Sequence, residues 1–275
     1  MNIFYCGDKN IETGLALSVM SLSKNTDQPL NIFVFTLNYH ENGYDIFPIR
    51  NEVVAILERY LREYNAGSSV RLFDCTQFFR MEIPQANMDT RFTPCCMLRL
   101  YADFIPDIPD RVLYLDYDVL CRADFSDFYN QDMEGVEIAG SPDYYGQWVY
   151  SRPIWGRNYL NSGVLLMNME EIRRSGLMRR CREMCEEKLM FLPDQHAINR
   201  QCKSKRVCDR RYNEQRMLHS DTVFQHFSTT FRLLPYPQVV NVKPWNVEQL
   251  HKKLRLFDYD NLLIEFQQLK EKITK

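Results

Sequence analysis

The sequence predicts an α/β fold with a mostly parallel sheet flanked by helices. Strand-like and helix-like segments alternate along the first third of the chain, an order that is typical of parallel strands joined by helices. Several strand-like runs are apolar enough to be buried on both faces, as parallel strands are. The chain has 275 residues, of which 45% are hydrophobic and 25% charged, the composition of an ordinary globular protein.

The elements of the first third follow one another in order. Runs rich in β-branched and aromatic residues predict strands at 2–6, 30–37 and 69–74. Apolar residues at helical spacing predict helices over 12–26 and 49–65, the second closed by Asn65 and Gly67. The pair Thr93-Pro94 predicts a further helix over 94–104, because proline is favoured at the first helical position.

The next strand ends in two carboxylates. In RVLYLDYDVLC, residues 111–121, Asp116 and Asp118 follow a buried apolar run. Side chains two apart on a strand point to the same side, so these like charges lie close together. Burying them costs several kcal/mol unless a cation lies between them. Mn²⁺ and Mg²⁺ prefer carboxylate oxygens and also bind phosphates, so the pair predicts a divalent metal site at the strand's carboxyl end.

The remainder of the chain is less regular. Strands are predicted over 136–143 and 158–168, and helices over 169–189 and 193–202. The segment 229–242 is interrupted by prolines, so we expect it to be irregular. The last segment, 247–275, is predicted to be helical at its ends and to pack on the domain.

Polar residues in this half are candidates for binding. Asn161 and Gly163 precede a buried strand, where a glycine lets the backbone approach a ligand closely. Asp194 and Gln195 stand at a helix start, and His226 in FQHFS is a potential nitrogen ligand. Taken singly, each has a structural alternative: a turn glycine, a helix cap or a satisfied core histidine.

The order of the motifs along the chain is more informative than any one of them. YCGDKN, the arginine before the acidic strand, LYLDYDVL, NSGVLLMN, PDQHAIN, HFS and KPW together resemble glycosyltransferase family 8. That family includes bacterial lipopolysaccharide galactosyl- and glucosyltransferases and glycogenin. The resemblance runs from Met1 to about Trp245.

The resemblance implies a fold and an activity. The fold is GT-A, with a catalytic domain over 1–245, of which about 1–120 binds the nucleotide and 121–245 faces the acceptor, followed by a helical extension over 246–275. The activity is transfer of a hexose, galactose or glucose, from a UDP-sugar to a glycan or glycolipid acceptor, with retention of configuration and with Mn²⁺ or Mg²⁺. A cation is wanted because negative charge grows on the leaving diphosphate.

The resemblance also implies residue roles. The metal ligands would be Asp116, Asp118 and His226. Contacts to the donor would come from Cys6, Asp8, Asn10, Arg99, Tyr117, Asn161, Gly163 and Lys243. Asp194 and Gln195 would hold the transferred sugar as catalytic residues, and Asp143 matches a position near the acceptor. Gln195 is a weak nucleophile, which favours attack from the leaving group's own face over a covalent intermediate.

The chain departs from the family pattern in two places. Lys243 follows His226 at a longer spacing than in several relatives and without the intervening glycine, so Arg232 is a rival for the diphosphate. His219 competes with His226 but lacks the HFS context. Ile11 stands where relatives carry an aromatic residue that stacks on uracil, so uracil recognition is either looser or supplied by another side chain.

Two other functions are compatible with parts of the pattern. One is a nucleotide-sugar-binding protein that has lost its activity. The other is a phosphatase of the haloacid dehalogenase type, in which two aspartates also follow an apolar strand. Such proteins usually open with that motif and continue it with glycine-threonine, whereas here it begins at residue 116 and reads DYDVL.

Charge and cysteine content limit the partners and the compartment. The net charge of -2 gives no reason to expect binding to nucleic acid, and no apolar run approaches the roughly 20 residues of a membrane span. The N-terminus lacks the pattern of a secretory signal. The nine cysteines are scattered without paired spacing, so reduced thiols are expected. We therefore expect a cytoplasmic location, either free or peripheral to the inner face of the membrane.

Two segments have surface interpretations. The basic run 199–216 is predicted to be a solvated face, with contact to an anionic membrane or lipid-linked acceptor as the alternative. The aromatic stretch 143–155 is either a lid over the acceptor or a small packed subdomain, since aromatic faces stack on sugar rings. The sequence indicates no oligomeric state.

Overall fold

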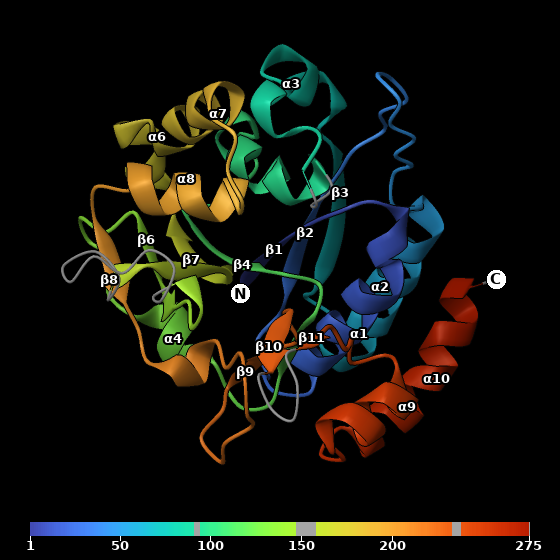
Figure 1. Cartoon of the computed structure of the whole chain (residues 1–275). Helices are drawn as coiled ribbons and strands as arrows, with labels where there is room; N and C mark the ends of the chain where they lie inside the picture. Colours follow the sequence, from blue (N-terminus) through green and yellow to red (C-terminus); the bar gives the residue numbers. More distant parts are fainter. Residues whose placement is uncertain (91–93, 147–157, 233–237, 275) are drawn as a thin grey trace.

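The computed structural model describes residues 1–90, 94–146, 158–232 and 238–274. Its centre is a seven-stranded sheet in the order β3-β2-β1-β4-β7-β6-β8 (Figure 1). The strands are β1 (Asn2–Cys6), β2 (Asn31–Thr36), β3 (Ser69–Asp74), β4 (Arg111–Leu115), β6 (Ile138–Pro142), β7 (Leu160–Asn168) and β8 (Lys205–Val207). The pairs β3-β2, β2-β1, β1-β4 and β6-β8 are parallel, and only β7 runs antiparallel to both of its neighbours. The predicted mostly parallel sheet is confirmed.

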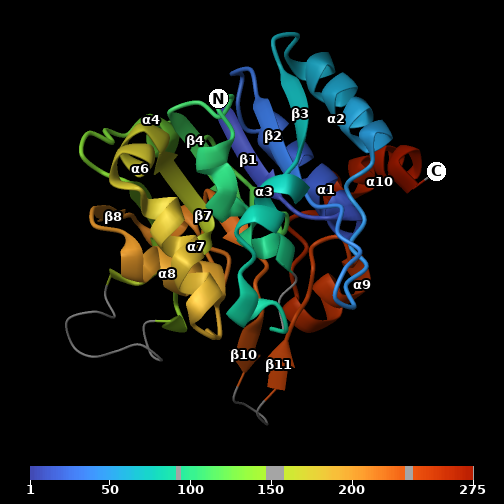
Figure 2. The ribbon, with the colours of Figure 1, turned by 90° about the horizontal axis from the view of Figure 1, so that it is seen from above.

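Helices cover both faces of the sheet (Figure 2). One face carries α1 (Glu12–Ser23), α2 (Asn51–Tyr64) and α10 (Asp260–Thr274). The other carries η3 (Pro94–Phe104), α6 (Met169–Ser175), α7 (Leu177–Glu187) and α8 (Pro193–Gln201). Alternate side chains of β1 serve the two layers: Ile3 and Tyr5 belong to the first apolar core, Phe4 and Cys6 to the second. Because both faces are buried there, the central strands β1 and β4 are apolar after their first residue, whereas the outer strands β3 and β8 carry charged side chains.

Several shorter elements connect these layers. They are η1 (Lys9–Ile11), α3 (Thr76–Met81), η2 (Gln85–Asn87), α4 (Ser126–Asn130), η5 (Arg210–Tyr212), α9 (Val247–Gln249) and the π-helical η6 (Leu250–Leu254). Two small antiparallel pairs stand apart from the main sheet: β5 (Val119–Cys121) with β9 (Phe224–His226), and β10 (Thr230–Arg232) with β11 (Gln238–Val240).

The helix predicted over 94–104 is present with these bounds and winds as a tighter 3-10 helix. Two local predictions were wrong. The helix expected over 169–189 is broken at Gly176, whose φ of 69° is a left-handed conformation that ends α6. The segment 229–242, expected to be irregular, contains the β10–β11 pair, whose strands are too short to show a pattern.

The C-terminal helix α10 completes one of the apolar cores. Its buried side chains, Leu263, Phe266, Leu269 and Ile273, recur at helical spacing and join the core shared with α1 and α2. All nine cysteines are free thiols. Among the described residues, no helix combines the length and the apolar character that crossing a bilayer requires.

Candidate active site

Two carboxylates and an imidazole converge at the carboxyl end of β4. Asp116, Asp118 and His226 each offer a ligand atom, and these atoms lie within 4.8 Å of one another. The Nε2 of His226 is 3.3 Å from Oδ1 of Asp118 and 3.6 Å from Oδ2 of Asp116. Neighbouring ligands of an octahedral divalent ion stand about 3 Å apart when each is about 2.1 Å from the ion. The donor set therefore fits a divalent cation with little rearrangement.

The backbone brings these residues together in a way that the sequence did not predict. Asp116 and Asp118 lie in the turn between β4 and β5, not on a strand, so strand periodicity is the wrong reason for their proximity. The β5–β9 ladder places Val119 opposite His226, and the N–H of Phe227 donates to the carbonyl of Asp118 at 3.0 Å. A three-residue ladder thus holds a late histidine beside an acidic turn more than 100 residues earlier.

Gly163 makes room for this cluster. A Cβ at this position of β7 would lie 2.2 Å from Cε1 of His226 and 3.0 Å from Oδ2 of Asp116. Its carbonyl accepts a hydrogen bond from the N–H of Asp116 at 2.8 Å. The sequence predicted a glycine that admits a ligand, and what approaches it here is the imidazole of the protein itself.

Asp118 is paired with cations of the chain. Nζ of Lys243 lies 2.5 Å from its Oδ2, and His226 faces its other oxygen. Burial alone would raise the pKa of Asp118, but the charges of Lys243 and His226 outweigh burial and hold it well below its usual range. Burial would likewise lower the pKa of His226, yet the facing carboxylates leave it raised. The protein therefore supplies cationic groups to the acidic turn.

Asp116 is held by a buried arginine. Nη2 of Arg99 donates to its Oδ1 at 2.9 Å, and the hydroxyl of Tyr114 donates to the same oxygen at 2.6 Å. The guanidinium lies over the Tyr114 ring, 4.0 Å from its centre. Arg99 also reaches Asp194, with Nε 3.3 Å from Oδ2. One arginine therefore links the acidic turn after β4 to the start of α8.

The start of α8 is fixed by β7. Ser162 donates its N–H to Oε1 of Gln195 at 2.9 Å and its hydroxyl to Oδ2 of Asp194 at 3.2 Å. The N-cap position of this helix is Leu192, so the carboxylate of Asp194 is turned towards Arg99 and Ser162. Burial raises the pKa of Asp194, and Arg99 offsets this only in part.

The predicted nucleotide contacts lie at the end of β1, in the η1 turn that follows it, and in the acidic turn. Asp8 is buried and caps η1, accepting from the N–H of Asn10 at 2.9 Å and from its Nδ2 at 3.2 Å. Cys6, at the end of β1, is buried, and burial raises the pKa of its thiol. Tyr117 packs near Trp245, with ring centres 5.9 Å apart. Asp8 and Asn10 thus bond to each other, while Tyr117 lies within the acidic turn itself.

The structure also places the rival residues. His219 is exposed and pairs with Glu214, with Nδ1 2.9 Å from Oε2, so it lies outside the carboxylate cluster. The side chain of Arg232 lies outside the described part of the structure, as do residues 147–155 of the aromatic stretch. Ile11 is buried in the core, and its side chain packs against Gly7.

Sequence reasoning missed one buried part of this site. Within the basic run 199–216, predicted to be a solvated face, Asn213, Glu214 and Gln215 are buried. Nδ2 of Asn213 donates to Oδ1 of Asn161 at 2.9 Å. The run carries no apolar periodicity that would predict burial. The available signal was the two amide residues of YNEQ, Asn213 and Gln215, which stand among charged residues.

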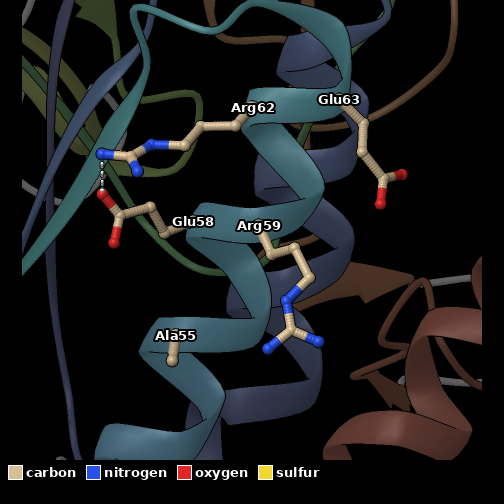
Figure 3. A pocket seen from close by; sticks show the side chains of 5 residues that line it. All are labelled: Ala55, Glu58, Arg59, Arg62 and Glu63. Atoms are coloured by element: carbon tan, nitrogen blue, oxygen red, sulfur yellow. Dashed lines mark ion pairs between the residues drawn. The ribbon is translucent and has the colours of Figure 1, made fainter.

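A hollow elsewhere on the molecule has a different character. It is lined by side chains from a single helix, α2: Ala55, Glu58, Arg59, Arg62 and Glu63 (Figure 3). Glu58 and Arg62 pair along the helix at 2.8 Å. None of the predicted site residues lies on α2, and this hollow is an exposed helix surface.

Comparison with known proteins gives a consistent result. Residues 2–249 match the sequence profile of Glycosyl transferase family 8. The chain is 23% identical over 230 residues to a putative glycosyltransferase of Haemophilus influenzae, covering 78% of this chain and 63% of that protein. It is 26% identical over 253 residues to a lipopolysaccharide 1,3-galactosyltransferase of Salmonella typhimurium, covering 82% and 70%. The chain therefore spans roughly two thirds of the length of these relatives.

Solved structures resemble the whole chain. The galactosyltransferase LgtC, crystallised with donor and acceptor sugar analogues, superposes with a TM-score of 0.69 at 19% identity, covering 100% of this chain and 97% of that one. The bifunctional glycosyltransferase WbbM gives a TM-score of 0.71 at 13% identity, covering 100% and 51%. Likeness at these identities shows the fold, and it confirms the predicted GT-A architecture.

Proposed function

Because the chain belongs to glycosyl transferase family 8, we propose that it transfers a hexose, galactose or glucose, from a UDP-sugar to a glycan or glycolipid acceptor. The reaction retains the configuration of the sugar and depends on a divalent ion, Mn²⁺ or Mg²⁺. The observation that carries the proposal is the convergence of Asp116, Asp118 and His226 beside the buried Arg99 and Asp194. The names of the bacterial relatives supply the class of sugar and acceptor.

The metal ion is assigned to the acidic turn. Its ligands are Asp116, Asp118 and His226, whose oxygen and nitrogen atoms suit Mn²⁺ and Mg²⁺. When bound, such an ion supplies positive charge to the diphosphate leaving group. Lys243, beside Asp118, is placed to add a second positive charge there. Together, the metal ion and Lys243 would offset the repulsion between the carboxylates of Asp116 and Asp118.

The remaining residues act on the donor sugar. Asp194 and Gln195 lie next to Ser162 and Arg99, in the direction from the metal ligands towards α8. Asp194 carries negative charge where the sugar ring becomes positive during bond breaking. Arg99 holds both Asp194 and Asp116, so it sets the spacing between the sugar-binding and the metal-binding carboxylates.

The contacts of Gln195 support attack from the leaving group's own face. Its Oε1 already accepts the N–H of Ser162, and its Nε2 donates to Oδ2 of Asp143 at 3.2 Å. A covalent intermediate on Gln195 would require Oε1 to leave this bond. In the proposed route the acceptor hydroxyl forms its bond to the anomeric carbon on the face from which UDP departs, and its proton passes to the departing phosphate oxygen. The amide of Gln195 orients the sugar in this step.

The proposal includes a cytoplasmic location, where UDP-sugars are made, either free or peripheral to the inner face of the membrane. Asp143, which the family resemblance assigns to the neighbourhood of the acceptor, is buried and bonded to Asn161 and Gln195. This placement makes Asp143 a support for the sugar-binding amides.

The test is release of UDP from UDP-galactose and UDP-glucose, with Mn²⁺, with Mg²⁺ and with a chelator. We expect turnover with one donor and a metal ion, and none with the chelator. Calorimetric binding of UDP-sugar without turnover, with glycan acceptors supplied, would identify an inactive binding protein. Metal-dependent hydrolysis of p-nitrophenyl phosphate without UDP release would instead favour the phosphatase.

A further inference from the structure

The two nitrogens of the His226 ring face different surroundings. Nε2 faces the carboxylates of Asp116 and Asp118. Nδ1 lies on the opposite side, 3.1 Å from Oδ1 of Asn161 and 3.3 Å from Oδ1 of Asn213. All of these side chains but Asp116 are at least nine-tenths buried, and Asn213 is 1% exposed. The protonation of this ring is therefore set by protein groups.

Hydrogen-bond accounting fixes the orientation of both amides. A carboxylate oxygen only accepts, so the group of Asn161 that lies 2.7 Å from Oδ2 of Asp143 is its NH₂. Its Oδ1 therefore points the other way, where it also accepts the N–H of Gly163 at 2.9 Å. Asn213 donates its own NH₂ to that oxygen at 2.9 Å, which leaves the Oδ1 of Asn213 facing His226.

We infer that Asn213 is a positioning residue for the metal site: together with Asn161 it holds the proton of His226 on Nδ1 and leaves Nε2 free to bind the metal ion. Both groups facing Nδ1 are acceptors, so this nitrogen must be the donor. Nε2 faces carboxylate oxygens, which a cation would otherwise bind. With a cation in the cluster the imidazole is neutral and carries its single proton on Nδ1, so Nε2 presents its lone pair to that cation.

The backbone makes this arrangement rigid. The segment that follows Asn213 runs beside β9. The N–H of Glu214 donates to the carbonyl of Phe224 at 2.8 Å, and the N–H of His226 donates to the carbonyl of Glu214 at 2.9 Å. Asn213 and His226 are thus held on neighbouring stretches of chain. Asn213 acts on the metal site only through His226 and Asn161, which separates it from the ligands themselves.

The test measures metal affinity, and it rests on the proposed metal site. The Mn²⁺ dissociation constant is read from the electron paramagnetic resonance of free Mn²⁺, with UDP present. Asn213→Leu should weaken Mn²⁺ binding by about 10- to 100-fold, the usual effect of removing the partner of a metal-bound histidine. Asn87→Leu is the matched control, because Asn87 is also fully buried, with its amide bonded to Cys185, Lys188 and Met190. Wild-type affinity in Asn213→Leu would overturn the inference.

A second readout does not need the Asn213 variant. The ¹⁵N shifts of the His226 ring in wild-type protein with diamagnetic Mg²⁺ and UDP present should show a protonated Nδ1 and an unprotonated Nε2. The signal is assigned by its loss in His226→Gln. A ring protonated on Nε2 would contradict the inference even if Asn213→Leu fails to fold. Failure of the wild-type protein to bind Mn²⁺ would instead count against the proposed function, whatever the tautomer.

Discussion

Two buried arginines of this molecule have partners of the same kinds, carboxylates and aromatic rings, in different surroundings. Arg99 lies between Asp116 and Asp194 and over the ring of Tyr114. Arg182, on α7, lies between Glu82 and Asp103 and over two aromatic rings. Each arginine side chain is 4% exposed. A buried arginine held by two carboxylates is therefore not, by itself, evidence of a functional site.

The difference lies in what the carboxylates face. Asp103 uses both of its oxygens on Arg182, and the guanidinium also donates to the carbonyl of Leu100, so this network is closed. Asp116 gives only Oδ1 to Arg99, while its Oδ2 faces His226 and Asp118 lies beside it. The open network presents spare ligand atoms that converge on one point, and this is the feature that marks the site.

The largest expected effect comes from removing a ligand of the open network. Asp118→Ala should lower metal-dependent UDP release by about 10²- to 10³-fold, since it removes one of the proposed metal ligands and leaves Lys243 without its carboxylate. Initial rates with saturating Mn²⁺ measure this. Asp127→Ala, at an exposed position of α4, is the control and should be mild. Equal activity in Asp118→Ala would show that the open network is not the metal site.

A change on the sugar side should affect turnover and spare binding. Gln195→Ala should lower kcat by about 10²-fold, because the amide that Ser162 and Asp143 orient no longer holds the sugar. The dissociation constant for UDP, measured by calorimetry, should stay within about twofold. If the loss appeared only in UDP affinity, Gln195 would belong to the nucleotide contacts.

In the closed network, the effect should fall on stability. Arg182→Met should lower the free energy of unfolding by about 3 kcal/mol, because it leaves Glu82 and Asp103 without their cation. Denaturant titration measures this, and kcat at a temperature where the variant is folded should be unchanged. A variant of normal stability and reduced kcat would give the closed network a functional role.

The smallest effect is a difference in the pH dependence of stability in metal-free protein. The pKa of Asp118 is lowered in the folded protein, so its ionised form adds to the free energy of unfolding. This stabilisation is present above the pKa of about 3.9 in the unfolded chain and is lost as the pH falls through the folded pKa. The raised pKa of Asp194 has the opposite sign, so its ionised form opposes folding at neutral pH. Asp118→Asn should therefore be destabilising at pH 7 and Asp194→Asn stabilising, as thermal denaturation can measure. The same sign in both variants would contradict this.

Much of the open network could be predicted because its parts lie at the ends of recognisable strands. The apolar run of β4 identified Asp116 and Asp118, and the run of β7 identified Gly163. What brings His226 to them is a ladder of three-residue strands, which is too short to carry a periodic pattern. The assignment of His226 to the site was predicted from the order of the motifs alone.

Other parts could not be predicted for related reasons. Asn213 lies in a charged run with no apolar spacing, and only its neighbours in space reveal that it is buried. The break at Gly176 was missed because a single glycine inside a helical pattern is often tolerated. Both cases depend on tertiary contacts, which a single sequence does not show.

The central claim is most directly tested by diffraction at the manganese absorption edge from crystals soaked in UDP and Mn²⁺. We predict one anomalous peak bounded by the carboxylates of Asp116 and Asp118 and by Nε2 of His226, with the diphosphate on its open side. UDP bound with no anomalous density at that position would contradict the account.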